Sequence, residues 1–188
     1  MAFTALLDAC VLYPAPLRDL LISLAVPGIY RPKWTETICE EWIRNVLKSR
    51  SDLRREQLER TRSFMERAVP DALITGYESL IEGLTLPDPG DRHVLAAAIM
   101  GRVDVIVTFN HKDFPTGIVE PYRIEVQDPD DFLACQIDVN EPAALSAVKQ
   151  QRGRLKNPPA TIEDFLATLD QQRLPRTVER LRPFAELL

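Results

Sequence analysis

The stretch that decides the fold runs from Gly90 to Pro115 and reads GDRHVLAAAIMGRVDVIVTFNHKDFP. After Asp91, apolar residues recur at the spacing of one helix face and Gly101 supplies a stop, so a short, largely buried helix is expected. The segment 103–107 is almost continuously apolar and β-branched, which is typical of a strand covered on both faces. Polar residues follow this strand directly: Thr108, Asn110 and Asp113. We expect the chemistry of the protein to lie at this polar cluster.

A second buried strand is predicted at the start of the chain, where the apolar segment Phe3 to Leu7 ends on Asp8. Between the two strands the periodicity predicts mainly helices, over residues 17–26, 35–48, 51–68 and 76–83, with a short strand over 70–75. Thr35 and Ser51 have the positions of helix N-caps. Residues 118–126 contain one more candidate strand. Strands that alternate with helices indicate an α/β fold with a central parallel sheet.

From Pro129 onward this alternation stops and only helices are predicted, with a loop over 156–160. Three residues have positions typical of a helix cap or first turn: Asn140, Thr161 and Pro175. The helices are too short and too poor in core residues to predict an independent domain. We therefore expect a main domain over 1–130 and a helical extension over 131–188 that packs on it or on a partner.

Composition limits the classes of protein. The chain has 188 residues, 45% of them hydrophobic, which is enough for one domain with a real core. Its three cysteines are far apart and odd in number, which favours a reduced cytoplasm over a disulfide framework or a zinc site. No basic region precedes the first apolar run and no apolar run is long enough to cross a membrane, so neither secretion nor membrane insertion is expected. The net charge of −5 argues against nucleic-acid binding through overall charge.

One segment has the opposite charge. Residues 44–67 contain eight basic residues and four acids, which gives this segment a net charge of +4. The segment is either a solvated helical surface with ordinary ion pairs or a surface that faces nucleic acid, and charge alone does not separate the two. The candidate nucleic-acid-binding residues here are Arg44, Lys48, Arg54 and Arg55.

The polar residues that end the two buried strands are expected to meet. Carboxyl ends of parallel strands lie at one edge of the sheet, so Asp8, Asn110 and Asp113 should come together although about a hundred residues separate them. Topology alone places Asp91 at the opposite edge, because it begins the helix that leads into the second strand. Crowded carboxylates repel one another unless a cation neutralises them, and Mg²⁺ or Mn²⁺ prefers such oxygen ligands. The pattern therefore indicates a metal site that activates water against a phosphodiester.

Other interpretations explain single residues. Asp8 as the cap of a turn and Asp91 as the cap of a helix would have ordinary structural duties. A phosphatase of the aspartyl-phosphate type needs a second acid two residues after the first, where this chain has Cys10, which we interpret as a small apolar filler. His93 is predicted to be a packed or surface residue, and His111 has no histidine partner at metal-site spacing.

Four segments together resemble, in order and spacing, the motif regions of PIN-domain nucleases, especially bacterial toxins of the VapC type. They are LLDACVLYP, TETICEEWIRNVL, PGDRHVLAAAI and IVTFNHKDFP. No single motif is specific, whereas four in register are. The resemblance covers about residues 3–130. It implies a small three-layer α/β/α domain whose acidic positions, Asp91 included, share one pocket.

The resemblance also implies the identity of the acids. Asp8 matches the first acid of the family and Asp91 the third. The second is a glutamate that directly precedes a large apolar residue, which selects Glu41, next to Trp42, over Glu40. Periodicity by itself does not separate the two glutamates.

The last motif departs from the family pattern. The family often has Thr, any residue and then Asp, whereas this chain has Thr108, Phe109 and Asn110. An asparagine carbonyl can coordinate a cation but brings no charge, so Asp113 is the candidate fourth carboxylate. Cys10 also replaces an asparagine often found two residues after the first acid.

A metal-dependent endoribonuclease, the toxin half of a toxin-antitoxin pair, is the function that the resemblance implies. Its Mg²⁺ or Mn²⁺ ligands would be Asp8, Glu41, Asp91 and Asp113, assisted by Asn110. Thr108 and the basic residues would guide the RNA, and an antitoxin protein and a second copy of the chain are the implied partners. Two alternatives stay open: a non-catalytic PIN domain that binds RNA or a protein, and a housekeeping nuclease of RNA processing.

Overall fold

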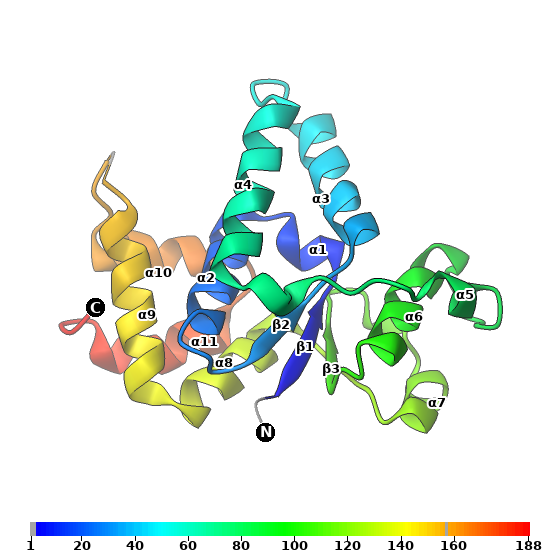
Figure 1. Cartoon of the computed structure of the whole chain (residues 1–188). Helices are drawn as coiled ribbons and strands as arrows, with labels where there is room; N and C mark the ends of the chain where they lie inside the picture. The colour runs from blue at the N-terminus through cyan, green and yellow to red at the C-terminus, as the bar shows by residue number, and fades with distance from the viewer. Residues whose placement is uncertain (1–2, 157) are drawn as a thin grey trace.

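In the computed structural model, which describes residues 3–156 and 158–188, a four-stranded parallel sheet lies at the centre of the molecule (Figure 1). The spatial order of the strands is β2-β1-β3-β4. Their bounds are β1 (Thr4–Leu7), β2 (Arg31–Lys33), β3 (Val105–Val107) and β4 (Glu125–Gln127). In register, Leu6 pairs with Lys33 on one side and with Ile106 on the other. The prediction of an α/β fold with a parallel sheet is confirmed.

Helices cover the sheet and extend beyond it. In the first part of the chain they are α1 (Ala9–Leu12), α2 (Ala15–Ala25), α3 (Glu36–Ser49), α4 (Arg55–Ala68), α5 (Glu78–Ile81), α6 (Arg92–Met100) and α7 (Thr116–Val119). The later helices are α8 (Pro129–Val139), α9 (Glu141–Arg154), α10 (Ile162–Gln171) and α11 (Pro175–Leu181). Short 3₁₀ turns connect them: η1 (Pro70–Ala72), η2 (Pro89–Asp91), η3 (His111–Asp113), η4 (Glu120–Tyr122) and η5 (Arg182–Phe184).

The two central strands are buried because helices cover both faces of a parallel sheet. Residues 5–7 and 105–107 are completely buried, as their unbroken apolar sequence predicts. The edge strand β2 escaped sequence analysis, since it is three residues long and contains Pro32, which only an edge strand tolerates. The strand predicted over 70–75 is wrong: Pro70 begins the turn η1, and only Leu73 forms an isolated bridge, to Trp34.

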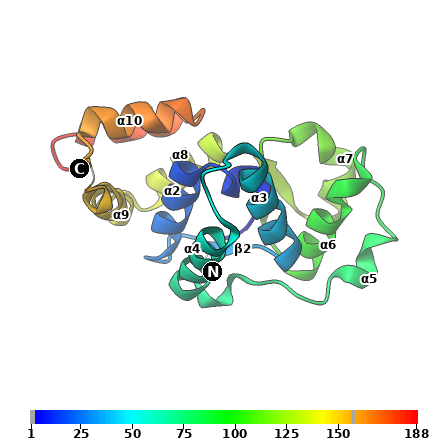
Figure 2. The same ribbon diagram turned by 90° about the horizontal axis from the view of Figure 1, so that it is seen from above.

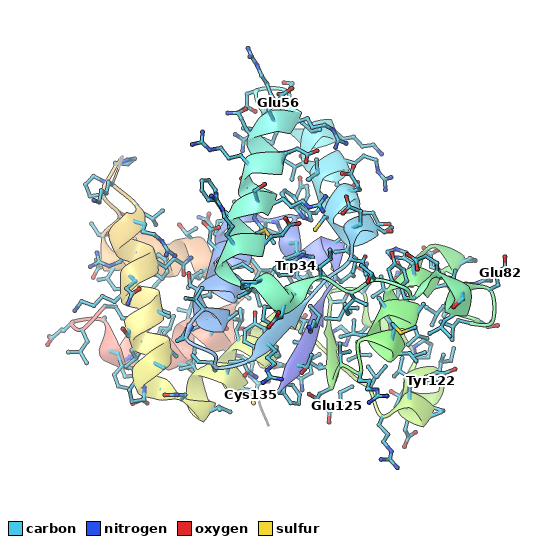
Figure 3. The ribbon with its side chains drawn as sticks, viewed as in Figure 1. Trp34, Glu56, Glu82, Tyr122, Glu125 and Cys135 are labelled. Carbon is cyan, nitrogen blue, oxygen red and sulfur yellow. The ribbon has the colours of Figure 1, made fainter. Side chains whose placement is uncertain are left out.

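The helices α3 and α4 stand as an upright pair above the sheet (Figure 1). The predicted cap of α3 is confirmed, because Thr35 Oγ1 accepts the backbone N–H of Ile38 at 3.1 Å. The predicted start of α4 after Ser51 is wrong. The helix begins at Arg55, where the backbone N–H of Arg54 donates to the side chain of Gln57, and residues 51 and 52 form a turn instead. Figure 3 shows the tip of this pair at Glu56 and its base near Trp34.

The apolar residues of α4 differ in their burial. Leu58 and Met65 are buried, but Phe64 is 54% exposed. The guanidinium of Arg67 lies over its ring at 4.7 Å. This exposed aromatic lies on the side of α4 that faces α9 across a groove described below.

The C-terminal helices pack against the sheet domain on the side away from α5–α7 (Figure 2). α9 lies against α2, and α11 lies against α8. The carboxylate of Asp130 in α8 caps α11 by accepting the backbone N–H groups of Arg176 and Thr177, at 2.9 and 2.7 Å. The rings of Tyr30 and Phe132 meet edge-on at 4.9 Å, so the helical extension shares the core of the sheet domain.

The sequence predicted the local features of this extension. Asn140 caps α9, Thr161 caps α10 and Pro175 is the first residue of α11. Residue 157 of the predicted loop, like residues 1 and 2, lies outside the described residues. Among the described helices, none combines the length and the apolar character that crossing a membrane requires.

Candidate functional site

The site begins at Asp8, which follows β1 directly and is 4% exposed. Its Oδ1 accepts the backbone N–H of Ala9 at 2.7 Å, so the side chain caps α1. Its Oδ2 accepts the hydroxyl of Thr108 at 2.7 Å and the thiol of Cys10 at 3.2 Å. Asp8 therefore acts as a cap, which is the structural role that the sequence analysis considered for it. A carboxylate has about four lone-pair positions, so these three bonds leave capacity for a further ligand.

Cys10 is part of this polar network, and its interpretation as an apolar filler is wrong. Its Sγ lies 3.3 Å from Thr108 Oγ1 and accepts the backbone N–H of Phe109 at 3.4 Å. Burial, together with the charge of Asp8, raises the pKa of the thiol to about 12. The thiol therefore stays protonated and can donate to Asp8.

Thr108 is buried, although it was expected to lie at the surface and contact RNA. It is completely buried, its hydroxyl donates to Asp8, and the same oxygen accepts the backbone N–H of Asn110 at 3.0 Å. Since its side chain has no exposed surface, its expected contact with RNA is not possible in this structure. Thr108 instead fixes the carboxylate of Asp8 and the start of the loop after β3.

Asp91 lies at the carboxyl edge of the sheet, and the topological argument that placed it at the opposite edge is wrong. A helix that leads into a parallel strand runs antiparallel to that strand, so its first residue lies at the edge where the strands end. The end of α6 confirms this direction, because the backbone N–H of Asp104, four residues after Met100, donates to the carbonyl of Thr4 at the start of β1. Asp91 makes no side-chain capping bond to α6.

The pKa of Asp91 shows that acidic side chains lie close together at this edge of the sheet. Burial and, after it, the charges of Asp8, Asp88 and Asp113 together raise the pKa of Asp91 to about 6, against an opposing effect of His93. Only carboxylates that lie close together repel in this way. The structure thus brings three sequence-predicted acids together: Asp8, Asp91 and Asp113.

Asp88 was missed by sequence analysis. Its carboxylate accepts the backbone N–H of Gly90 at 2.7 Å and caps η2, and its charge acts on Asp91. The available signal was the segment DPGD, in which an acid three residues before Asp91 is followed by proline and glycine. Such a turn folds the first acid back toward the second.

The two glutamates of α3 have different surroundings. Glu40 forms an exposed ion pair with Arg55 of α4 at 3.0 Å. Glu41 lies 3.1 Å from the Nε2 of His93, the second residue of the helix α6 that Asp91 precedes. The ring N–H does not point at the carboxylate, so this is an ion-pair distance without a hydrogen bond. Of the two, Glu41 is the glutamate on the side of Asp91.

Asn110 and Asp113 both lie in the segment that follows β3. Asn110 precedes the turn η3, and Asp113 ends it with its backbone N–H donating to the carbonyl of Asn110 at 3.0 Å. Both side chains are half-buried. Asp113 is the one whose charge acts on Asp91, whereas the amide of Asn110 brings no charge.

The basic residues predicted to bind nucleic acid fall into two groups. Arg55 is held between Glu40 and Glu59, so its charge is largely neutralised. Arg44 and Lys48 are exposed and lie three and seven positions after Glu41. This spacing places them on the helix face of Glu41, in a line that leads away from the acids. Arg54 is exposed at the start of α4.

The donor types at this edge fit a hard divalent cation, because every candidate ligand offers oxygen. The repulsion felt by Asp91 is the condition that a bound cation relieves. Within residues 3–156 and 158–188, however, no three Asp, Glu, His or Cys side chains stand close enough to hold an ion as placed. The chemistry of the donors fits, while their side chains do not form a closed ligand shell.

A parallel sheet with acids gathered at its carboxyl edge is the arrangement expected of a PIN domain. The sequence model of the PIN domain matches residues 4–112, more than half of the chain. The chain therefore belongs to the PIN-domain family, and the resemblance inferred from its motifs is confirmed.

Two further comparisons refine this assignment. The model described as the VapC50 C-terminal domain matches residues 129–183. The chain is 38% identical over 109 residues to a protein of Mycobacterium tuberculosis (strain ATCC 25618 / H37Rv) named "Putative ribonuclease VapC50". The matched region covers 56% of this chain and 64% of that relative, so it spans less than two thirds of the relative's length. No solved structure matches the chain.

Proposed function

We propose that this protein is a divalent-metal-dependent endoribonuclease and the toxin of a toxin-antitoxin pair. The observation that carries the proposal is the raised pKa of Asp91, to which burial and the nearby charges of Asp8, Asp88 and Asp113 contribute. Membership of the PIN-domain family and the name of the relative support the reaction class.

We also propose that the nuclease domain comprises residues 1–130 and that residues 131–188 are its extension. The three cysteines of the protein are free, which supports the further proposal that it works in the cytoplasm.

In this proposal Asp8, Glu41, Asp91 and Asp113 hold Mg²⁺ or Mn²⁺. When bound, such an ion lowers the pKa of water and stabilises charge on the attacked phosphodiester. Thr108 and Cys10 fix the Oδ2 of Asp8, so that this carboxylate keeps one orientation. The carbonyl oxygen of the Asn110 side chain would assist the carboxylate ligands.

The exposed basic residues would hold the RNA. Arg44 and Lys48 continue the face of α3 that carries Glu41, and Arg54 lies at the start of the neighbouring helix. Cations along one line match the spacing of phosphates along an RNA strand, and their contribution falls with added salt. Arg55 would contribute less, since two carboxylates already neutralise it.

A groove of about 750 Å³ between α2, α4 and α9 supports a protein partner. Its lining is mainly apolar and includes the exposed Phe64 and Val26, with Arg154 at its side. An antitoxin segment with apolar residues and flanking acids would complement this surface. A homodimer is a further part of the proposal, and light scattering of the purified protein tests it.

The decisive experiment compares two Asp→Asn variants at opposite edges of the same strands. Asp8→Asn should lower the cleavage of RNA in Mg²⁺ by about a hundredfold or more. Asp104→Asn is the matched control, because Asp104 Oδ2 accepts the backbone N–H of Thr4 at 2.7 Å at the amino edge, far from the acids. Its variant should cleave like the wild type. Equal cleavage by wild type and Asp8→Asn would refute the site.

A second candidate function is a PIN domain that binds RNA or a protein without cleaving it. Two observations favour it: Asn110 replaces the usual acid, and the described side chains do not close around an ion. Calorimetric titration with Mn²⁺ separates the candidates. Saturable binding that is lost in Asp8→Asn supports the nuclease, and no binding at millimolar Mn²⁺ supports the non-catalytic domain. A housekeeping nuclease is distinguished by the absence of a small antitoxin gene beside its own.

A further inference from the structure

The C-terminal extension reaches the strand end that carries the acids. Arg173 lies in the turn between α10 and α11, and its guanidinium carbon is 4.5 Å from the centre of the Phe109 ring. This distance is that of a cation–π contact. Phe109 is the second residue after β3, between Thr108 and Asn110. The contact therefore joins the extension to the loop that carries the candidate site.

Phe109 belongs to the network around Asp8. Its backbone N–H donates to Cys10 Sγ at 3.4 Å, and the preceding Thr108 donates to Asp8 Oδ2 at 2.7 Å. The guanidinium of Arg173 thus packs on a residue whose backbone contacts the partners of the first acid. This contact places a cation two residues after β3, beside the start of the loop that carries Asn110 and Asp113.

The backbone holds Arg173 in a fixed position. Its φ is +66°, in the left-handed region that costs a non-glycine residue about 1 kcal/mol. Its N–H donates to the carbonyl of Asp170 at 2.9 Å, which closes the end of α10. The next residue, Leu174, is completely buried, and Pro175 begins α11. The backbone of Arg173 is therefore part of the tight connection between two helices.

The charge of Arg173 is also available, in contrast to that of most arginines of the extension. Four other arginines of the extension are engaged by oxygen atoms of carboxylates, hydroxyls or main-chain carbonyls: Arg152, Arg154, Arg176 and Arg180. Arg173 is exposed, and in the described part of the chain no carboxylate lies within ion-pair distance of it. The contact with the Phe109 ring uses the π-system of the guanidinium and not its N–H groups, which can still donate.

We propose that Arg173 is a phosphate-binding residue of the nuclease site, so that the extension supplies part of the RNA-binding surface. This inference rests on the proposed function and names a binding group for it outside the PIN domain. A guanidinium that packs on an aromatic ring still has two parallel N–H donors, which match the oxygens of a phosphate. The RNA would lie between Arg173 on one side and the line of Arg44 and Lys48 on the other.

The test measures binding of a fluorescent single-stranded RNA by anisotropy in EDTA, where metal-dependent cleavage is absent, over a range of salt concentrations. Arg173→Met should weaken binding about tenfold, as expected for one charge-assisted contact. It should also lower the slope of log affinity against log salt by about 0.7, the contribution of one phosphate contact to single-stranded RNA. Arg180→Met is the matched control, since Arg180 pairs with Asp138 on the surface of the extension. Arg173→Lys should keep the slope, because it keeps the charge.

The outcomes separate this inference from the proposed function. If Arg173→Met binds RNA like Arg180→Met, or if Arg173→Lys loses as much slope as Arg173→Met, the contact is only structural and the inference is wrong. Cleavage by the wild type would still support the nuclease in that case. If the wild type neither binds nor cleaves RNA, the proposed function fails and the inference fails with it. Thermal unfolding of each variant shows that the compared proteins are folded.

Discussion

The hydroxyl of Thr108 donates a hydrogen bond of 2.7 Å to Oδ2 of Asp8 and joins the ends of β3 and β1 across 100 residues of sequence. Both side chains are buried, so water does not compete for this bond. A hydrogen bond to a buried carboxylate is stronger than one between neutral groups and restricts the orientation of the acid. The first candidate ligand is therefore held in place by the strand that carries the last motif.

Replacing Thr108 by valine should weaken both stability and activity. The variant keeps the shape of the side chain but removes the donor, so the free energy of unfolding should fall by about 2 kcal/mol and RNA cleavage by about tenfold. Thr108→Ser should retain most of both. Denaturant unfolding and a cleavage assay measure the two effects. Thr177→Val is the control, because Thr177 is equally buried but lies in α11. Cleavage by Thr108→Val at the wild-type rate would show that this bond does not serve the site.

Glu40 and Glu41, the two glutamates of α3, should differ in their effect on RNA cleavage. Glu41→Gln should lower RNA cleavage at least about tenfold, since the carboxylate on the side of His93 and Asp91 loses its charge. Glu40→Gln should leave cleavage within about twofold and lower the free energy of unfolding by at most about 0.5 kcal/mol, because an exposed ion pair contributes little. Steady-state cleavage of one RNA by both variants is the measurement. The reverse order of effects would reassign the second acid to Glu40.

Asp91 should make the metal-free protein less stable as the pH rises. Its pKa, raised to about 6 in the folded protein, lies above the value of about 4 in the unfolded chain, so between these values the folded state binds more protons. The stability that the protonated group contributes is complete below pH 4 and is lost as the pH rises through 6. In EDTA at pH 7.5, Asp91→Asn should therefore be more stable than the wild type by about 1 kcal/mol, after allowance for its half-exposed side chain.

Denaturant unfolding at pH 4 and pH 7.5 checks this prediction, and the difference between Asp91→Asn and wild type should vanish at pH 4. Mg²⁺ provides an internal comparison at pH 7.5. An ion that binds only the folded wild type should raise its stability in a concentration-dependent way and have a smaller effect on Asp91→Asn. An Asp91→Asn variant that is less stable than wild type in EDTA at pH 7.5 would contradict the assigned repulsion.

Arg18 should be a strong contributor to stability for a charged residue. It is 6% exposed, its Nη1 donates to the carbonyl of Leu12 at 2.7 Å, and its guanidinium carbon lies 4.6 Å from the ring centre of Trp42. It thereby links α1, which follows Asp8, to α3, which carries Glu41. Arg18→Ala should lower the free energy of unfolding by about 3 kcal/mol, through the lost hydrogen bond and cation–π contact.

Arg60→Ala is the control for this prediction, because Arg60 lies 5.7 Å from the ring of the exposed Phe64. It should change stability by no more than about 0.5 kcal/mol. Arg18→Lys should recover less than half of the loss, since an ammonium cannot stack and donate as the planar guanidinium does. Equal effects of Arg18→Ala and Arg60→Ala in denaturant unfolding would show that the buried link is unimportant.

The sequence by itself determined the central strands, most of the helix starts and the family. Mainly apolar runs at 3–7 and 103–107 predicted the two central strands, and the motif order predicted the family. Thr35, Asn140 and Thr161 predicted helix starts correctly, because a cap depends on contacts within about three residues. Such local rules can be read without knowing the fold. They failed at Ser51, where the turn before α4 uses Arg54 and Gln57 instead.

Only the tertiary structure decided which distant groups meet. Sequence reasoning placed Asp91 at the wrong edge until the resemblance corrected it, interpreted Cys10 as apolar and assigned Thr108 to RNA. The sheet register puts all three around or beside Asp8. The contact of Arg173 with Phe109 likewise has no sequence signal, since 64 residues separate them and no periodicity connects the extension to β3. Periodicity describes one element at a time, whereas burial, repulsion and long-range hydrogen bonds arise only when elements pack.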